Sequence, residues 1–366
     1  MNISLSIVVA AYNVQNYIEQ CVQSILDQLA PDHELIVFND GSTDATFERL
    51  RTLRQDWEGA NFRIINQPNQ GISGVRNGGI ASARGEYLVF VDGDDVVRPG
   101  ALAMLGEAIA THHPDAIAYD LRIWHPEDEQ KSYRLSRGYP ANELLSDQST
   151  ILNILFADRH MYACAYVYRR AIYLRLPTPV FPLGRVFEDI STTPCLHSLC
   201  ETLLYLPHEL INYRQHPTSI TKAISAKSSH DLSTALSLAK QYLVERGVDA
   251  SVKRHFDIAA AYFYVGAVKD SYQLSAVDGR RLRKQIKPIF AQTLFGDCAS
   301  MLASTRSEGL VSHNLPRDVK TLKHVRLALN DNILFGIKQS VTRKLKLWRR
   351  QRKAAGVLQP MAVGTS

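Results

Sequence analysis

The sequence lacks an apolar run long enough to cross a membrane. Nowhere in its 366 residues do roughly 18 to 20 apolar residues follow one another, the length that a membrane-spanning helix needs. The first ten residues have no basic leader, and their apolar run continues into a strand-like pattern, so we expect no signal peptide. These two absences predict a cytoplasmic protein.

Cysteine is scarce and irregularly spaced. The five cysteines stand at positions 21, 164, 195, 200 and 298, which form neither a disulfide framework nor a zinc-ligand pattern. A reducing compartment therefore fits this sequence best.

Acidic residues are missing from one stretch near the C-terminal end. Residues 338–353 hold eight Lys or Arg and no acid, whereas the whole chain has 42 basic and 36 acidic residues. Without that stretch, 34 basic residues face 36 acidic ones. The body of the protein is therefore not a nucleic-acid-binding surface, and the positive charge belongs to the tail.

Strand and helix patterns alternate over the first 120 residues. The short apolar, β-rich runs predict strands at 5–10, 34–38, 62–65, 87–91 and 116–119. The helical spacing of apolar residues predicts helices at 16–29, 44–57, 73–83 and 99–112. This alternation predicts an α/β fold, a mostly parallel sheet with helices on both faces.

The rest of the chain is less regular at first and helical later. Short strand candidates occur at 165–168 and 203–206. Apolar periodicity then predicts helices at 233–244, 256–268 and 281–294, followed by a basic helix at 332–348. We therefore divide the chain into 1–225, a helical accessory region 226–330, and a basic amphipathic helix with its tail, 331–366.

Polar clusters follow three of the predicted strands. They are Tyr12-Asn13, the turn 39–44 (NDGSTD) and the turn 92–95 (DGDD). In open parallel sheets, ligands bind beyond the carboxyl ends of the strands, so these clusters are expected to share one site.

The turn 92–95 is the strongest indication of chemistry. Asp92, Asp94 and Asp95 crowd at the end of an apolar strand, where mutual repulsion and burial would raise their pKa values. A hard divalent cation such as Mg²⁺ or Mn²⁺ takes oxygen ligands and would stabilise their charges; such an ion can also neutralise a leaving diphosphate. The alternative interpretation is a solvated acidic turn.

Two further clusters point to nucleotide binding. In the turn 39–44, Gly41 and Asp44 suit a tight turn and a helix cap, whereas Asp40 could accept a hydrogen bond from a base. In the segment 69–77 (NQGISGVRN), a glycine-containing loop opens a helix with Arg76 in its first turn, and both features favour phosphate. The alternative for Arg76 is a surface salt bridge.

Two later segments carry weaker indications. The pair Glu188-Asp189 in the segment FED could supply a general base, although many surface loops contain such pairs. In the segment YRQHPTSIT, His216 could be a metal ligand, although a lone histidine is more often structural.

Taken together and in this order, these segments resemble the family 2 glycosyltransferases of the GT-A fold. The resemblance covers roughly residues 4–221, from the opening SIVVAAYN through NDGSTD and the block ending in VFVDGDD to YRQHPTSIT. The similarity is greatest to bacterial capsule, O-antigen or teichoic-acid-type transferases, whose donor is usually a UDP-sugar.

The resemblance implies roles for individual residues. Ala11 and Tyr12 would line the base pocket, Asp40 would contact the uracil ring, and Arg76 would contact the nucleotide or its diphosphate. Asp92 and Asp94 would form the D-x-D motif with Asp94 as the direct metal ligand, while Asp95 would lie near the donor sugar. His216 would complete the metal shell, and Asp189 would deprotonate the acceptor in an inverting displacement.

This sequence departs from the family pattern in two places. The opening strand ends in Ala10-Ala11-Tyr12-Asn13, where the family commonly has a proline, and the turn reads Asn39-Asp40, where Asp-Asp is common. Because Asp40 is kept, these departures bear on the selectivity for the base and leave the metal site unaffected.

The expected partners are a nucleotide-sugar donor and a glycan or lipid-linked glycan acceptor. The basic helix, residues 333–353, could lie on an anionic membrane surface, pack on the body of the protein or contact another subunit. A non-catalytic nucleotide-sugar-binding module is the alternative function. A processive synthase is disfavoured because no tryptophan lies in a Gln-x-x-Arg-Trp segment, and a nucleotidyltransferase because residues 8–16 contain no glycine.

Overall fold

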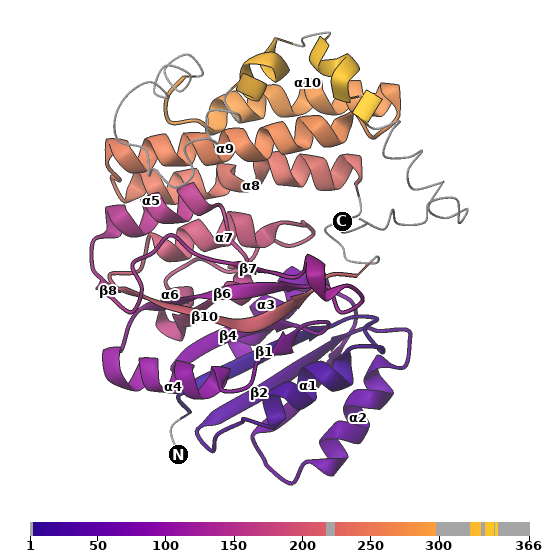
Figure 1. The fold of residues 1–366 in the computed structure, drawn as a ribbon, viewed down its shortest axis with the longest axis vertical. Coiled ribbons are helices and arrows are strands. Elements are labelled where there is room, and N and C mark those ends of the chain that lie inside the picture. The colour runs from indigo at the N-terminus through magenta and orange to yellow at the C-terminus, as the bar shows by residue number, and fades with distance from the viewer. Residues whose placement is uncertain (1–2, 217–223, 298–322, 331–333, 340, 343–366) are drawn as a thin grey trace, which may run out of the picture.

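The computed structural model describes residues 3–216, 224–297, 323–330, 334–339 and 341–342. A mixed sheet forms one part of the molecule, and a layer of long helices is stacked on it (Figure 1). Within the described residues, no helix has the length and apolar character needed to span a bilayer.

The sheet is parallel over most of its width, as the sequence predicts. Its strands follow the order β3-β2-β1-β4-β9-β6-β10-β5, with β7 paired to β6 and β8 paired to β10. The bounds are β1 Leu5–Ala11, β2 His33–Asp40, β3 Phe62–Gln67, β4 Tyr87–Asp92, β5 Val96–Val97, β6 Ala116–Trp124, β7 Tyr133–Leu135, β8 Leu144–Leu145, β9 Tyr166–Arg169 and β10 Leu203–Arg214. Strand β9 runs antiparallel between β4 and β6 and joins the predicted parallel half to the rest.

The helices of the first part flank this sheet. They are α1 Ile18–Leu26, α2 Thr46–Asp56, α3 Gly71–Ser82, α4 Ala101–His112, α5 Gln148–Asp158, α6 Arg170–Leu174 and α7 Glu188–His197. The first four match the predicted helices. The sequence did not predict α5 or α7, because both are buried almost all round and so show no amphipathic period.

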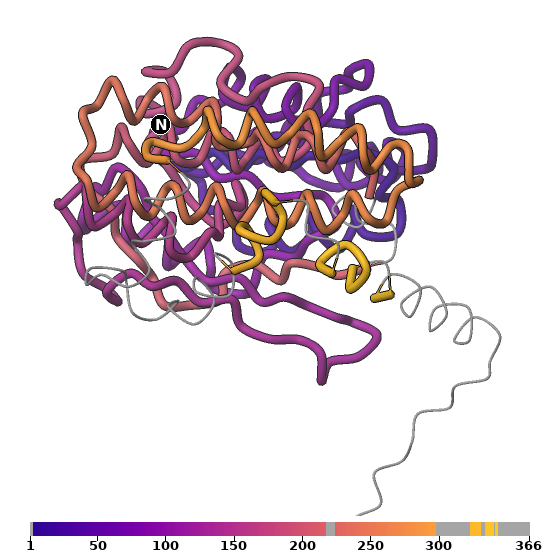
Figure 2. Tube along the Cα trace, turned by 90° about the horizontal axis from the view of Figure 1, so that it is seen from above, coloured from indigo at the N-terminus to yellow at the C-terminus, as the bar shows by residue number. Residues whose placement is uncertain are grey.

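The helical layer consists of α8 Ala226–Glu245, α9 Ala250–Ser271 and α10 Ala276–Thr293, which lie side by side across the molecule (Figure 2). It packs through α8 on α7 and through α9 on α5. Helix α8 begins directly after the proposed boundary at residue 225, and the division into separate units there stays a prediction. Of the basic helix predicted at 332–348, residues 334–339 and 341–342 are helical; the remainder lies outside the described residues.

The register of the central strands positions the site. Ala11 pairs with Asn39 across β1 and β2, and Ala10 pairs with Asp92 across β1 and β4. These strands therefore end at the same level, and the predicted polar clusters meet at one edge of the sheet.

Candidate active site

One cavity of about 2000 Å³ lies at this edge of the sheet. Its lining includes eight of the nine residues that the sequence predicted for the site: Ala11, Tyr12, Asp40, Arg76, Asp92, Asp94, Asp189 and His216. The ninth, Asp95, is not among the described residues that line the cavity. The structure thus brings together residues that are up to 205 positions apart in the sequence.

The end of the cavity near β1 and β2 is the predicted base pocket. Ala11 is buried, whereas Tyr12 is half exposed at 48%. Asp40 is buried, and its Oδ1 accepts hydrogen bonds from Gln67 Nε2 (2.7 Å) and Gln70 N (2.9 Å), while its Oδ2 accepts one from Gly71 N (2.8 Å). Asp40 therefore fixes the start of α3, and its contact with a base stays a prediction.

The turn after β2 is held by close backbone contacts. Gly41 has a φ of 69°, and a Cβ at this position would lie 2.7 Å from the backbone nitrogen of Asn69, so only glycine fits. Asp44 accepts a hydrogen bond from the backbone of Thr46 (3.0 Å) at the start of α2 and another from Gln15 N (3.2 Å). The turn and the segment after β1 are thereby tied together.

The three carboxylates after β4 differ in their surroundings. Asp92 and Asp94 are partly exposed in the cavity, while Asp95 is 1% exposed and accepts a hydrogen bond from Arg214 N (2.8 Å) through Oδ1. Its other oxygen, Oδ2, is buried and has no hydrogen-bond partner among the described residues. Burial, reinforced by Asp94 and Asp92, raises the pKa of Asp95 well above its usual value. Burial also raises the pKa of Asp92, against the opposing effect of Arg76.

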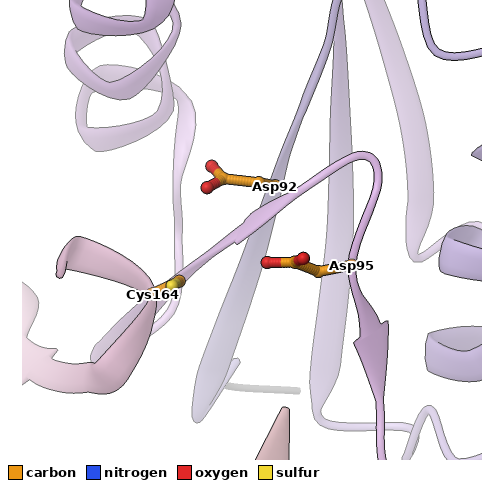
Figure 3. A group of neighbouring side chains, drawn as sticks. All are labelled: Asp92, Asp95 and Cys164. Atoms are coloured by element: carbon orange, nitrogen blue, oxygen red, sulfur yellow. The ribbon is translucent and has the colours of Figure 1, made fainter. Parts of the chain in front are cut away.

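A cysteine that the sequence analysis did not connect with the site lies beside these acids. Ligand atoms of Asp92, Asp95 and Cys164 are all within 4.8 Å of one another, and both carboxylates point to the side on which Cys164 lies (Figure 3). Burial, together with Asp92 and Asp95, raises the pKa of the Cys164 thiol well above its usual value. A protonated thiol is a poor ligand for Mg²⁺ or Mn²⁺, so the oxygens are the better donors here.

The side chains of Asp94 and His216 are in direct contact at the lining of the cavity. The distance between Asp94 Oδ2 and His216 Nε2 is 2.7 Å, although 122 residues separate them in the sequence. A carboxylate oxygen and an imidazole nitrogen this close form a donor set that suits Mn²⁺. The structure thus brings the two predicted ligands together, and their binding of a metal ion stays a prediction.

Arg214 contacts the backbone of Asp94 from the end of β10. Its Nε donates to the backbone oxygen of Asp94 (2.6 Å) and its guanidinium donates to Gln20 Oε1 (2.5 Å). The guanidinium lies over the rings of Tyr17 (5.0 Å) and Trp124 (4.3 Å). Arg214 lies in the segment YRQHPTSIT, where the sequence indicated a role only for His216.

Arg76 is buried in an ion-pair cluster. It is 4% exposed, donates to Glu188 Oε1 and lies 3.4 Å from Asp92 Oδ1. Its guanidinium also lies over the rings of Phe90 (5.8 Å) and Phe181 (5.5 Å). The predicted alternative was a surface salt bridge, whereas this pair is buried, and the contact of Arg76 with a diphosphate stays a prediction.

Asp189 lies in the first turn of α7, next to Glu188. Burial raises its pKa to about 7; Glu188 adds to this increase and Arg76 opposes it. A carboxylate with such a pKa can accept a proton near neutral pH. The residue lines the same cavity as the acidic turn, and its role as a general base stays a prediction.

Comparison with known proteins identifies the family. Residues 6–176 match the family model described as Glycosyl transferase family 2. The sequence is 30% identical over 241 residues to the glycosyltransferase GlyA of Streptococcus pneumoniae, covering 64% of this chain. It is also 30% identical over 223 residues to the uncharacterized glycosyltransferase EpsJ of Bacillus subtilis, covering 60% of this chain. Residues 6–176 therefore carry the sequence pattern of glycosyl transferase family 2.

The chain spans only part of these relatives, 34% of GlyA and 63% of EpsJ. Two solved structures share the fold. TarS 1–349 of S. aureus has a TM-score of 0.61 at 18% identity, over 89% of this chain and 90% of that one. The mannosyltransferase PcManGT of Pyrobaculum calidifontis has a TM-score of 0.51 at 15% identity, over 90% of this chain and 86% of that one. The GT-A-like fold predicted from the sequence, with its C-terminal helices, is confirmed.

The buried position of Arg76 leads to a prediction about stability. We expect Arg76→Gln to lower the free energy of unfolding by about 3 to 5 kcal/mol, because it leaves Glu188 and Asp92 without their buried counter-charge. Urea denaturation measures this change. The matched control is Arg49→Gln, which breaks the exposed pair of Arg49 with Glu19 and should cost only about 0.5 kcal/mol. Equal effects of the two substitutions would contradict the assigned burial.

Proposed function

We propose that the protein is an inverting, metal-dependent glycosyltransferase that moves a sugar from a nucleotide-sugar, a UDP-sugar in our proposal, to a hydroxyl of a cell-surface glycan or its lipid-linked precursor. The observation that carries this proposal is the arrangement of one cavity. Asp189, with its raised pKa, lines the same cavity as the pair formed by Asp94 and His216. The match of residues 6–176 to the family model supports it.

The donor end of the cavity suits a nucleoside diphosphate. Ala11, Tyr12 and Asp40 would bind the base, and the turn after β4 would face the diphosphate. TarS has been crystallised with UDP and with UDP-GlcNAc, and PcManGT with GDP-Man and Mn²⁺. These complexes support a nucleotide-sugar donor for this chain.

Asp94, Asp92 and His216 are the residues that would hold Mn²⁺ or Mg²⁺. Their oxygen and nitrogen donors fit such an ion. When bound, the ion neutralises charge on the diphosphate as the sugar leaves it.

Asp189 would act on the acceptor. In the proposed step, the carboxylate takes the proton of the acceptor hydroxyl while that oxygen forms a bond to the anomeric carbon of the sugar. The bond from this carbon to the diphosphate breaks, and the nucleoside diphosphate leaves with its electron pair. A single displacement of this kind inverts the anomeric centre. A non-catalytic binding module would have no use for a base at the position of Asp189.

The donor site leads to a prediction about UDP binding. We expect UDP to bind the wild-type protein at least about tenfold more tightly with Mn²⁺ than without it, because a cation held by the carboxylates would offset the negative charge of the diphosphate. Asp94→Ala should abolish this difference, while the control Asp56→Ala, at an exposed site on α2, should keep it. Isothermal titration calorimetry measures both. Absence of UDP binding with and without Mn²⁺ would rule out the UDP assignment.

The raised pKa of Asp189 predicts the pH dependence of the reaction. A base must be deprotonated, so kcat/KM for sugar transfer should rise with pH up to about 7 and level off above it. Asp189→Asn should reduce kcat by about 100-fold or more. Glu188→Gln should move the rise to lower pH, because the charge of Glu188 raises the pKa of Asp189. The control Glu19→Gln should leave the profile in place, and a profile unaffected by Glu188→Gln would argue against Asp189 as the titrating group.

We also propose that the basic helix associates with an anionic membrane surface. Leu334, Ile337 and Val341 are exposed at 75%, 53% and 50%, at a spacing that places them on one helical face. Phe335, by contrast, is buried against Tyr272. An exposed apolar face with basic residues beside it suits a membrane surface on which a lipid-linked acceptor would lie.

This proposal predicts the outcome of a flotation experiment. The full chain with Leu334→Ser, Ile337→Ser and Val341→Ser should lose about 90% or more of its co-flotation with vesicles of phosphatidylcholine and phosphatidylglycerol. The control Val244→Ser with Val277→Ser removes exposed apolar residues elsewhere and should float like the wild type. Unchanged flotation of the triple variant with a lower sedimentation mass would instead assign this face to a contact between subunits.

A further inference from the structure

The cavity is larger than a donor alone requires. Pockets for small molecules and cofactors usually measure about 300 to 1000 Å³, whereas this one measures about 2000 Å³. Beyond Asp189 it continues between the sheet and the helical layer. Its far wall includes Lys227 at the start of α8, and Tyr262, Gly266 and Lys269 on α9. The spacing of these α9 residues places them on one face of the helix, so the helical layer helps to form the cavity.

This half of the cavity is rich in positive charge. Five cationic residues line it: Arg134, Arg159, Arg185, Lys227 and Lys269. Among the described lining residues, the acids lie either at the donor end or at the boundary, where Glu188 and Asp189 stand and Glu188 is already paired with Arg76. The two halves of one cavity thus carry opposite charge.

Among the described residues, two of these cations, Lys227 and Arg185, share one carboxylate. Asp231 is shared between two of them, lying 2.5 Å from Lys227 Nζ and 3.9 Å from Arg185 Nε. One negative charge against two positive charges leaves an excess at the entrance to α8. The half-exposed Arg134 is paired with Asp120, which is completely buried, so the positive end of that pair faces outward.

Aromatic rings accompany the cations. Tyr133, Tyr162 and Tyr262 line the same half, and Tyr133 is 55% exposed. The guanidinium of Arg159 lies 4.9 Å from the ring centroid of Tyr262. Tyrosine rings offer an apolar face together with a polar hydroxyl, which suits the packing of a sugar ring. A neutral oligosaccharide would use the rings but would gain nothing from the surrounding positive charge.

We propose that the acceptor is an anionic glycan whose phosphate or carboxylate groups bind the cations of this half, with Lys227 and Lys269 as specificity-determining residues. This inference rests on the proposed function, since it names the class of acceptor for that reaction. Binding places the acceptor hydroxyls along the wall that leads to Asp189. Because charge-assisted contacts dominate recognition, binding weakens as the salt concentration rises.

The test measures the binding of defined oligomers to the full chain by fluorescence anisotropy. The probes are labelled oligogalacturonate, with a carboxylate on each ring, labelled polyphosphate, and a neutral malto-oligosaccharide of matched length. The two anionic probes should bind about tenfold or more tightly than the neutral one at about 50 mM NaCl, and should lose this advantage at about 300 mM. Equal affinities for anionic and neutral probes would overturn the proposal.

A pair of variants assigns the effect to this surface. Lys227→Gln with Lys269→Gln should weaken the binding of both anionic probes about tenfold. The matched control, Arg281→Gln with Lys284→Gln, removes the same charge from exposed positions on α10 and should bind like the wild type. An equal loss in the two variants, or no loss in either, would show that overall charge rather than this wall binds the anion.

Two further measurements separate this inference from the proposals on which it depends. UDP binding with Mn²⁺ is measured on the same samples; its absence in the wild type would count against the proposed function, whereas its presence with no preference for anions would overturn only the acceptor class. Vesicles of phosphatidylcholine and phosphatidylglycerol form the last arm. If the two lysine substitutions weaken binding to vesicles but not to oligomers, the charge serves contact with lipid headgroups and the inference fails.

Discussion

The arrangement of the site depends on one buried cation. Arg76 on α3 is paired with Glu188 on α7 and with Asp92 at the end of β4, so a single guanidinium connects the acidic turn with the helix that carries Asp189. Two phenylalanine rings, Phe90 and Phe181, lie beside it and shield it from water. Without this charge, the carboxylates would repel one another in a buried environment. The positive charge of Arg76 therefore allows the acidic turn and the first turn of α7 to lie close together.

The sequence predicted the first half of the fold well because its elements are regular. The early strands are apolar runs that end in polar turns, and the early helices are amphipathic. The hydrophobic pattern of each element is therefore visible in the sequence. Helix α7 was missed because it buries Ser191, Thr192 and Thr193 together with apolar residues, which removes the contrast between faces. Contacts between residues far apart in the sequence could not be predicted either. Nothing in the spacing indicates that Arg76 pairs with Glu188, and the proximity of Asp94 and His216 followed only from the resemblance to a family.

The family model matches only part of the segment that contains the proposed site residues. Residues 6–176 contain the predicted base pocket and the acidic turn, whereas Asp189 and His216 lie beyond them. Two of the cations that line the other half of the cavity, Lys227 on α8 and Lys269 on α9, also lie beyond residue 176. In our proposal the donor is bound by the shared segment and the acceptor largely by the remainder. The sequence predicted that this layer is helical. It could not predict which helix face lines the cavity, because an amphipathic period does not identify the surface against which a helix packs.

The position of Arg214 links the two ends of the sheet-forming part of the chain. Arg214 is the last residue of β10, which pairs with β6, and its side chain reaches the backbone of Asp94 and the side chain of Gln20 near the start of the sequence. His216, two residues later, contacts the side chain of the same Asp94. The surroundings of Asp94 therefore depend on a strand that comes more than 100 residues later in the sequence, and a chain shortened before residue 203 would lack both contacts.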